Sequence, residues 1–402
     1  MNVPKLRFKE FTDKWQKVPL NLFTNIYGGY AFKSENLLNY KAKYQVIKMG
    51  NVNNNTLNLE KNPSYLNTIS QKELPYLLEK NDIILTLTGT FGKKDFGYSY
   101  QIKNETNLLL NQRLAVFKIT NSNYSANFLK YILLNNTFLN KFFRFSVGGT
   151  GNQANVSIQD IKSFKIPFPK LEEQNKISKF LTTVDKKITN LKNTITSLEN
   201  QKKGLLQQIF SQKLRFKDEN GNNYPNWEKK KLEDISNITM GQSPDSDFVN
   251  TEKIGTPFLQ GNAEFTNKYP IEKYWCTKPQ KIANPTDILL SVRAPVGAIN
   301  IANKKFCIGR GLSAISFNCN KLFGKYNLEF NLFQLIKKSQ GSTFSSINKK
   351  DISEVILFIP CLEEQTKIAD FLSAFDRKLE NQKAQLEHWK QIKKGLLQQM
   401  FV

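Results

Sequence analysis

Two small, polar, glycine-bearing segments recur at equivalent places in the two halves of this sequence. The first spans residues 146–153 and the second spans residues 339–344. Segments of this kind expose backbone N–H groups, which suit them to contact phosphate oxygens. An ordinary turn is the alternative for each segment, and its recurrence in both halves leaves the two interpretations open.

Residues that could carry catalysis are scarce. The single histidine, His388, lies in a helical pattern, which leaves general-base chemistry little to use. There is no GxxxxGK followed by serine or threonine, so an ATP-binding P-loop is not expected. Residues 284–287 lack the second proline and the aromatic of an amino-methyltransferase site, and no Glu-x-Lys or Asp-x-Lys of a nuclease follows Pro244-Asp245. The sequence therefore predicts a binding protein that has no catalytic activity of its own.

The cysteines do not form a metal-ligand pattern. All four lie in the second half without two-residue spacing: Cys276, Cys307, Cys319 and Cys361. A zinc knuckle needs closely spaced ligands, so neither structural zinc nor disulfides are expected. We expect the first three to be small buried hydrophobic residues among strands.

Positive charge is concentrated outside the predicted helices. The chain has 58 lysines and arginines against 34 acidic residues, a formal net charge of +24. Residues 1–170 carry +13 and residues 213–361 carry +7, whereas residues 171–212 and 362–402 carry only +3 and +1. A polyanion is the natural partner of such a surface. The pattern predicts that the globular domains contact the polyanion, and a generally cationic, solvated surface is the alternative.

The elements that must position these residues occur twice. Residues 171–210 return as residues 362–401, 191 positions later and without a gap, and the motif KLRFK at 5–9 returns at 213–217. A period this long indicates two whole domains rather than a solenoid. The predicted domains are residues 1–165 and 213–356, which alternate with long helices within residues 166–212 and 357–402.

The two helical segments carry a coiled-coil seam. Apolar residues alternate in spacings of four and three across about 40 residues, which is a heptad repeat. The seam residues that we expect to pack or to dock partners are Ile177, Leu181, Ile188, Leu205, Ile368, Leu372, Leu379 and Leu396. At about 1.5 Å per residue each helix would be about 60 Å long. Only an antiparallel pairing is compatible with the short connection after Phe210, so we expect two antiparallel helices related by a pseudo-twofold axis.

Two repeated residue types stand out in this seam. Lys202 and Lys393 interrupt it at the same place, either to fix one register or with their ammonium groups in water. Gly204 and Gly395 lie inside the helical pattern at a cost of about 1 kcal/mol against alanine. Close approach of another backbone would explain both glycines.

The globular domains are predicted to be mixed α/β. The apolar runs at residues 81–88 and 286–292 each lead into a loop that contains glycine. Runs of this length that end at such loops are typical of buried strands. No stretch approaches 18 apolar residues and the N-terminus has no signal-peptide core, so we expect a cytoplasmic protein without membrane contact.

The start and end of both helical segments resemble one known family. Residues 166–177 read IPFPKLEEQNKI and residues 359–368 read IPCLEEQTKI, and the segments end in LLQQIF and LLQQMF. The chain resembles the specificity subunits of type I restriction-modification systems over nearly its whole length. The second motif is shorter and has Cys361 in place of the second proline.

This resemblance implies a function and a set of partners. The two globular domains would be target recognition domains that each read half of a split sequence in double-stranded DNA. The helices would separate them and dock two methyltransferase subunits, to which restriction/translocase subunits are added for cleavage. S-adenosylmethionine, ATP and magnesium would belong to those partners, and this chain would carry no cofactor.

Candidate DNA-binding residues follow from their positions in predicted loops rather than from the resemblance. Lysine and arginine offer phosphate contacts, and arginine, asparagine and glutamine offer base contacts. The candidates are Lys33, Lys93, Lys94, Arg113, Asn152, Gln153, Gln242, Ser243, Arg293, Arg310, Ser342 and Thr343. Two other functions stay open. One is a methyltransferase or nuclease with a degenerate active site, and the other is a coiled-coil scaffold that binds nucleic acid without sequence preference.

Overall fold

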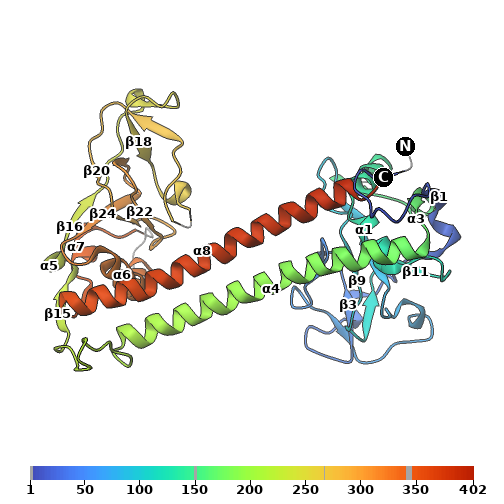
Figure 1. The fold of residues 1–402 in the computed structure, drawn as a ribbon, viewed down its shortest axis with the longest axis horizontal. Helices are drawn as coiled ribbons and strands as arrows, with labels where there is room; N and C mark the ends of the chain where they lie inside the picture. The colour runs from blue at the N-terminus through green and yellow to red at the C-terminus, as the bar shows by residue number, and fades with distance from the viewer. Residues whose placement is uncertain (1–2, 149–151, 267, 341–345) are drawn as a thin grey trace. The chain divides into compact units, whose positions relative to one another are not determined.

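The computed structural model of the chain describes residues 3–148, 152–266, 268–340 and 346–402. The chain forms two compact units, which we call unit 1 (residues 1–192 and 385–402) and unit 2 (residues 193–384). Both division points lie inside long helices, so each unit contains one globular domain and a piece of each long helix (Figure 1). The mixed α/β character predicted from the sequence is confirmed.

Unit 1 is built on a four-stranded antiparallel sheet. Its strands, in spatial order, are β2 (Thr24–Gly28), β11 (Leu114–Ile119), β7 (Ile83–Thr86) and β9 (Ser99–Gln101). Smaller sheets are formed by β10 (Leu108–Leu110), β3 (Tyr44–Ile47) and β6 (Tyr65–Leu66); by β12 (Val147–Gly148), β13 (Gln153–Asn155) and β8 (Thr88–Thr90); by β1 (Gln16–Pro19) and β14 (Lys165–Phe168); and by β4 (Val52–Asn53) and β5 (Thr56–Leu57). The short helices are α1 (Ala126–Leu133), α2 (Asn136–Arg144) and α3 (Ile158–Lys162).

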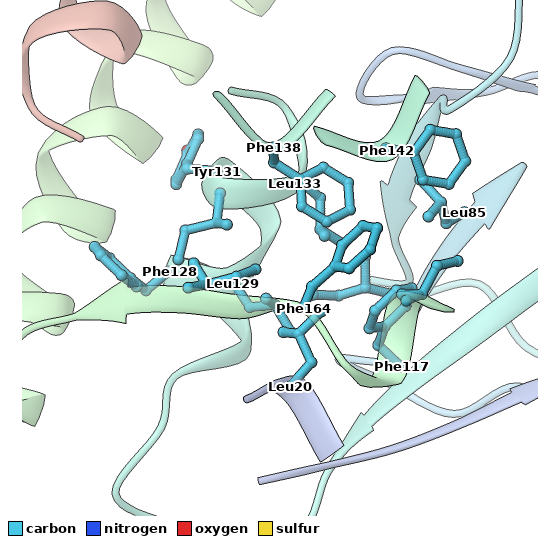
Figure 2. Close-up of a cluster of buried hydrophobic side chains, with 14 of the residues drawn as sticks. Leu20, Leu85, Phe117, Phe128, Leu129, Tyr131, Leu133, Phe138, Phe142 and Phe164 are labelled. Carbon is cyan, nitrogen blue, oxygen red and sulfur yellow. The ribbon is translucent and has the colours of Figure 1, made fainter. Parts of the chain in front are cut away.

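The continuous apolar run of β7 is explained by burial of both its faces. Ile83 and Leu85 point into the aromatic core formed with helices α1 and α2, whereas Ile84 points into a second core on the other face. Figure 2 shows the first core, in which Phe128 of α1 and Phe117 of β11 lie in one cluster. A strand covered on both sides has no polar face to expose, so its sequence shows no alternation.

Unit 2 repeats this plan. Its four-stranded sheet has the order β16 (Ser236–Met240), β24 (Leu312–Phe317), β21 (Ile288–Ser291) and β22 (Ile299–Ile301). The other strands are β15 (Glu228–Lys231) with β25 (Ile356–Ile359), and a five-stranded sheet of β17 (Val249–Asn250), β19 (Tyr274–Cys276), β18 (Thr256–Leu259), β23 (Phe306–Ile308) and β20 (Ile282–Ala283). The helices are α5 (Leu232–Ile235), α6 (Lys321–Gln340) and α7 (Lys349–Ser353).

The long helices are α4 (Leu171–Phe210) and α8 (Leu362–Gln399). Their antiparallel pairing is confirmed within each unit, because unit 1 joins the start of α4 to the end of α8 and unit 2 joins the end of α4 to the start of α8. In Figure 1 the red end of α8 and the green start of α4 both belong to unit 1. The second helix ends two residues before the predicted limit, and the two residues that follow it, Met400 and Phe401, pack into the unit 1 core.

The predicted seam is buried unevenly. Ile177, Leu181, Ile188, Ile368 and Leu372 are buried, as expected. Three other seam residues are only half-buried: Leu205, Leu379 and Leu396. Two helices cover each other along a narrow stripe, so Leu205 and Leu379, which belong to no hydrophobic cluster of the described residues, stay partly open to solvent. Leu396 instead packs against the core of unit 1.

The seam lysines form ion pairs between the two helices. Lys393 Nζ lies 2.6 Å from Asp185 Oδ1 in unit 1, and Lys202 Nζ lies 2.6 Å from Asp376 Oδ1 in unit 2. A tyrosine from the globular domain donates to the same carboxylate, Tyr131 to Asp185 at 2.9 Å and Tyr326 to Asp376 at 2.7 Å. The structure therefore favours the register hypothesis over ammonium groups that reach water.

Burial and the neighbouring carboxylate raise the pKa of both tyrosines. Each tyrosine therefore stays a hydrogen-bond donor over the range in which the carboxylate is charged. The arrangement ties one globular domain to both helices within each unit.

A second repeated contact explains why the same two sequence motifs occur together in each half of the chain. Arg7 of the first KLRFK donates to both carboxylate oxygens of Glu173, at 2.8 and 2.7 Å, and Trp15 donates to the same carboxylate at 3.3 Å. Glu173 is buried, and its hydrogen bond raises the pKa of the Arg7 guanidinium. The motif at the chain start thus anchors the motif at the helix start.

Unit 2 has the same anchor. Arg215 donates to Glu364 at 2.9 and 2.7 Å, and Trp227 donates to it at 3.0 Å. Because a buried carboxylate is costly without partners, each glutamate depends on its arginine and tryptophan. The sequence shows two adjacent glutamates in the first turn of each long helix, but it does not show that the second of each pair is the buried one.

Two expectations about small residues need correction. A Cβ atom added to Gly204 or Gly395 would meet nothing within 4 Å, so no backbone approaches either glycine within the described structure. Cys276 and Cys307 are buried in strands as expected, but Cys319 follows β24 outside any strand and is only half-buried. The described residues contain no helix that could span a membrane.

Candidate nucleic-acid interface

The candidate residues in the described part of the chain lie on segments that leave one end of the four-stranded sheet of each unit or pair with those segments. In unit 1, β2 ends at Gly28 and β7 ends at Thr86, while β11, antiparallel to both, begins at Leu114. The segments after β2 and β7 and the turn before β11 therefore leave the sheet at the same end. Strands β16, β21 and β24 repeat this arrangement in unit 2.

Four predicted residues of unit 1 come together where β8 pairs with β13. They are exposed, and they are Lys93, Lys94, Asn152 and Gln153. The backbone N–H of Phe91 donates to the carbonyl oxygen of Asn152 at 2.8 Å, which joins the two segments beyond the strand ends. Two cations and two amides thus share one surface, a combination suited to phosphate and base contacts.

The loop that carries these lysines is closed by Asp95. Its carboxylate accepts from the backbone N–H of Thr90 at 2.8 Å and from the Thr90 hydroxyl at 2.6 Å. These hydrogen bonds hold the pKa of Asp95 below its usual value. Asp95 is therefore occupied in shaping the loop, and Lys93 and Lys94 lie exposed on its surface.

The other two candidates of unit 1 lie on neighbouring segments at this sheet end. Arg113 is exposed in the turn before β11, and its carbonyl oxygen accepts from the Leu87 N–H at 3.0 Å. Lys33 is exposed on the segment after β2, and its ammonium lies 3.7 Å from the Glu35 carboxylate. An exposed pair at this distance contributes little, so it does not hold Lys33 away from another anion.

Unit 2 gathers four predicted residues at the equivalent end. The backbone N–H of Arg310 donates to the Ser243 hydroxyl at 3.3 Å, and Gln242 is the preceding residue. Arg293 follows β21 and forms an isolated bridge with Ser346. Gln242, Arg293 and Arg310 are exposed and Ser243 is half-buried. The predicted Ser342 and Thr343, with most of the second glycine-bearing segment, lie outside the described residues.

The structure reveals an equivalence that the sequence reasoning missed. A Cβ on Gly29 would lie 2.2 Å from the carbonyl oxygen of Asn111, and a Cβ on Gly241 would lie 2.2 Å from that of Gly309. Both positions therefore require glycine, because the backbones approach too closely for a side chain. The residue after each glycine occupies the same place, so Tyr30 of unit 1 corresponds to Gln242 of unit 2.

A second correspondence follows from the starts of β11 and β24. Gln112 lies two residues before β11 and Arg310 lies two residues before β24, and both are exposed. The Gln112 N–H donates to the Tyr30 carbonyl oxygen at 3.0 Å. Tyr30 and Gln112 are therefore candidate contacts that were not predicted. Alignment of the two halves at Gly29 and Gly241, with Ser34 and Ser246 five residues later, is the signal that could have found Tyr30.

Two apolar side chains are exposed on this basic surface of unit 1. Phe91 is 59% exposed and Val147 is 68% exposed. Phe91 directly follows β8, in the loop that carries Lys93 and Lys94, and Val147 lies in β12, which pairs with β13 in the same sheet. Apolar groups of this kind can contact thymine methyl groups or the faces of unstacked bases. The sequence analysis did not single out either residue.

Comparisons with known proteins point to one family. The family model described as Type I restriction modification DNA specificity domain matches twice, at residues 12–200 and 224–388. A putative type I restriction enzyme specificity subunit, MjaX of Methanocaldococcus jannaschii, is 32% identical over 98% of this chain and 95% of its own length. The chain belongs to the type I restriction-modification specificity subunits.

Solved structures show the same fold. The crystal structure of a type I restriction-modification S subunit from M. genitalium matches with a TM-score of 0.64 and 17% identity over 100% of this chain and 99% of that one. A chain from a study of complex assembly and conformational transition of the type I R-M system matches with a TM-score of 0.59 and 24% identity, covering 95% and 96%. The resemblance stated from the sequence motifs is thus confirmed, together with the fold class.

Each family match in this specificity subunit spans one globular domain and much of the helix that follows it. The domain and its helix therefore form the repeated unit in the family sense. Among the described residues, no group of three or more histidine, cysteine, aspartate or glutamate side chains could hold a metal ion.

Proposed function

We propose that this specificity subunit reads a two-part sequence in double-stranded DNA, one part with each globular domain. The observation that carries the proposal is that both units place exposed basic or amide side chains on the same sheet end. Tyr30 and Gln112 occupy in unit 1 the places that Gln242 and Arg310 occupy in unit 2. Different residues on one frame would read different bases, because arginine pairs with guanine and glutamine with adenine.

In this proposal residues 1–165 and 213–356 are the target recognition domains, and residues 166–212 and 357–402 hold the long helices. The helices dock two methyltransferase subunits, and restriction/translocase subunits join for cleavage. Leu379 of α8 is half-buried and leaves apolar surface open to such a partner. S-adenosylmethionine, ATP and magnesium act in those partners, and this chain is a non-catalytic subunit.

The test begins with the modified bases of the genome that encodes this chain. Sequencing of methylated adenines before and after deletion of the gene defines the target as the motif that loses its methylation. The purified chain with its methyltransferase partner should then bind a duplex carrying this motif at least a hundredfold more tightly than a scrambled duplex at physiological salt. Equal affinity for both duplexes would overturn sequence recognition.

The second candidate function is a coiled-coil scaffold that binds nucleic acid without sequence preference, and the net charge of +24 favours it. The same competition experiment decides between the two functions, because phosphate attraction alone does not distinguish the scrambled duplex. Methyl transfer by the purified chain alone, with labelled S-adenosylmethionine and DNA, would instead indicate an enzyme.

A further inference from the structure

Unit 1 contains a polar cavity between its globular domain and both long helices. Its volume is about 320 Å³. The globular domain contributes Asn54 and Asn55 from the turn between β4 and β5 and Asn136 from the start of α2. Lys192 comes from α4, and three further lysines come from α8. The cavity is separate from the sheet-end loops of the candidate interface.

The charge of this cavity is one-sided. Its walls include Lys192, Lys390, Lys393 and Lys394, whereas Asp185 is the single acidic residue among the described residues that line it. The Lys393 ammonium is paired with Asp185 at 2.6 Å, and the Lys390 ammonium is paired at 2.6 Å with Glu387, which is 65% exposed. Lys192 and Lys394 have no carboxylate partner among the described residues. The cavity therefore holds positive charge that the unit itself does not neutralise.

The equivalent place in unit 2 is neutralised. The helix repeat of 191 residues relates Lys192 to Lys383, and it relates Lys390 to Glu199. In unit 2 these two counterparts pair with each other at 2.8 Å. Thr189 of unit 1 corresponds to Glu380, which pairs with Lys268 at 3.5 Å. The lysine excess of unit 1 is thus not a requirement of the helix pair, because the equivalent stretch of the same two helices pairs in unit 2 without it.

A buried lysine beside this cavity shows the same difference. Lys130 of α1 is 5% exposed and has no carboxylate within ion-pair distance in the described structure. Its counterpart, Lys325, pairs with Glu329 at 2.5 Å, and the place of Glu329 is taken in unit 1 by Leu134, which lines the cavity. The pKa of Lys130 is lowered to about 8, mainly by burial; Asp185 raises it, and Lys103 and Lys393 lower it.

We propose that this cavity binds a phosphoryl group, with Lys192, Lys390 and Lys394 as its cationic ligands and Asn54 and Asn136 as hydrogen-bond donors. Lysine binds phosphate as a point charge, and amide donors fix its orientation. The side-chain oxygen of Asn55 is buried without a partner among the described residues, so it can accept from a ligand hydroxyl. The group belongs either to the DNA backbone, in which case this inference rests on the proposed function, or to a small free phosphate compound.

The test compares two matched double variants of the full chain. The cavity variant is Lys192→Ala with Lys394→Ala. Its control is Lys383→Ala with Lys203→Ala, which removes the same number of charges at the equivalent positions of unit 2. All four side chains lie on the helix surface and none is buried, so both variants should fold, which circular dichroism checks.

Two ligands distinguish the sources of the phosphoryl group. Calorimetry with inorganic pyrophosphate should show binding to the wild-type chain that weakens about tenfold in the cavity variant and is unchanged in the control, if the ligand is small and free. If the ligand is DNA, pyrophosphate shows no difference, and the salt dependence of duplex binding loses about two counterions in the cavity variant only. Identical behaviour of the two variants with both ligands would overturn the proposal. A wild-type chain that fails to distinguish target from scrambled duplex would remove sequence recognition, but it would leave the pyrophosphate result intact.

Discussion

Unit 1 and unit 2 differ most where their side chains face solvent and least where they are buried. The buried Arg7–Glu173 pair with Trp15 recurs as Arg215–Glu364 with Trp227, with nearly the same distances. At the sheet ends the residue types change, from Tyr30 and Gln112 to Gln242 and Arg310. The comparison shows that the buried contacts that hold each unit together can stay the same while the exposed residues at the sheet end change. Buried polar groups constrain each other, whereas exposed side chains on a fixed backbone can change independently.

The largest expected effect tests the frame. Glu173→Ala should destabilise unit 1 by about 3–5 kcal/mol, because it leaves Arg7 without its carboxylate in a mostly buried place. Glu364→Ala should cost unit 2 a similar amount. Denaturant unfolding followed by tryptophan fluorescence measures both. Glu172→Ala is the control, since Glu172 is exposed, and it should change stability by less than about 0.5 kcal/mol. A small effect of Glu173→Ala would show that the contact between the motif at the chain start and the motif at the helix start contributes little to stability.

The next largest loss of stability is expected from substitutions in the seam, and it should differ between the two helices. Ile188→Asp places a charge at a residue that is 9% exposed and should destabilise the helix pair by about 3 kcal/mol. Leu379→Asp, at the equivalent position, should cost clearly less because Leu379 is half-buried. Thermal unfolding monitored by circular dichroism at 222 nm gives the order. Equal losses would show that the uneven burial of the seam has no energetic weight.

The reading surfaces should respond one at a time. Gln112→Ala and Arg310→Ala should each reduce discrimination against a wrong base by about 1–3 kcal/mol, each in a different half of the target. Competition binding with duplexes that carry single base-pair changes measures this loss. If both variants affected the same half of the target, the assignment of one half to each unit would be wrong.

A smaller effect is expected from the tyrosines that hold the seam ion pairs. Tyr131→Phe removes a hydrogen bond to Asp185 and should cost about 1–1.5 kcal/mol, with Tyr326→Phe giving a similar value in unit 2. Denaturant midpoints at constant m-value report the change. If the two variants lost clearly different amounts of stability, then Lys130 or the neighbouring cavity would alter the strength of the contact among Tyr131, Asp185 and Lys393 in unit 1.

A separate effect depends on pH. The pKa of Lys130 is about 8 in the folded chain and is about 10.5 for an ordinary lysine, so the unfolded chain binds the extra proton between these values. Stability contributed by this group should therefore rise with pH from about 8 to about 10.5. The difference in unfolding free energy between wild type and Lys130→Met isolates the effect. A pH-independent difference would contradict the lowered pKa.

Much of the framework could be predicted from local patterns. The heptad spacing gave the limits of α4, and the apolar runs gave β7 and β21 close to their observed bounds. Repetition gave two copies of a domain followed by a helix, and the motifs around residues 171 and 362 gave the family. These features depend on periodicity and composition, which are readable along the chain.

Only some of the candidate DNA contacts could be predicted from local sequence patterns. Basic and amide residues in loops could be chosen from their types, as Lys93 and Arg310 were. Tyr30 and Gln112 were missed because their significance comes from Gly29 and from the start of β11, which only the sheet brings together. Phe91 and Val147 were missed because an apolar residue in or next to a strand is ordinarily buried.

The sequence by itself determined the duplication, the charge of the chain, the two long helices and the class of fold, because each is a property of residue order. The tertiary structure decided which of two adjacent glutamates is buried, which aspartate each seam lysine meets, and where the unneutralised lysines of unit 1 collect. Those outcomes depend on contacts between residues more than a hundred positions apart, such as Arg7 with Glu173 and Asp185 with Lys393. Such contacts form only when strands, helices and loops pack together, so no local pattern specifies them.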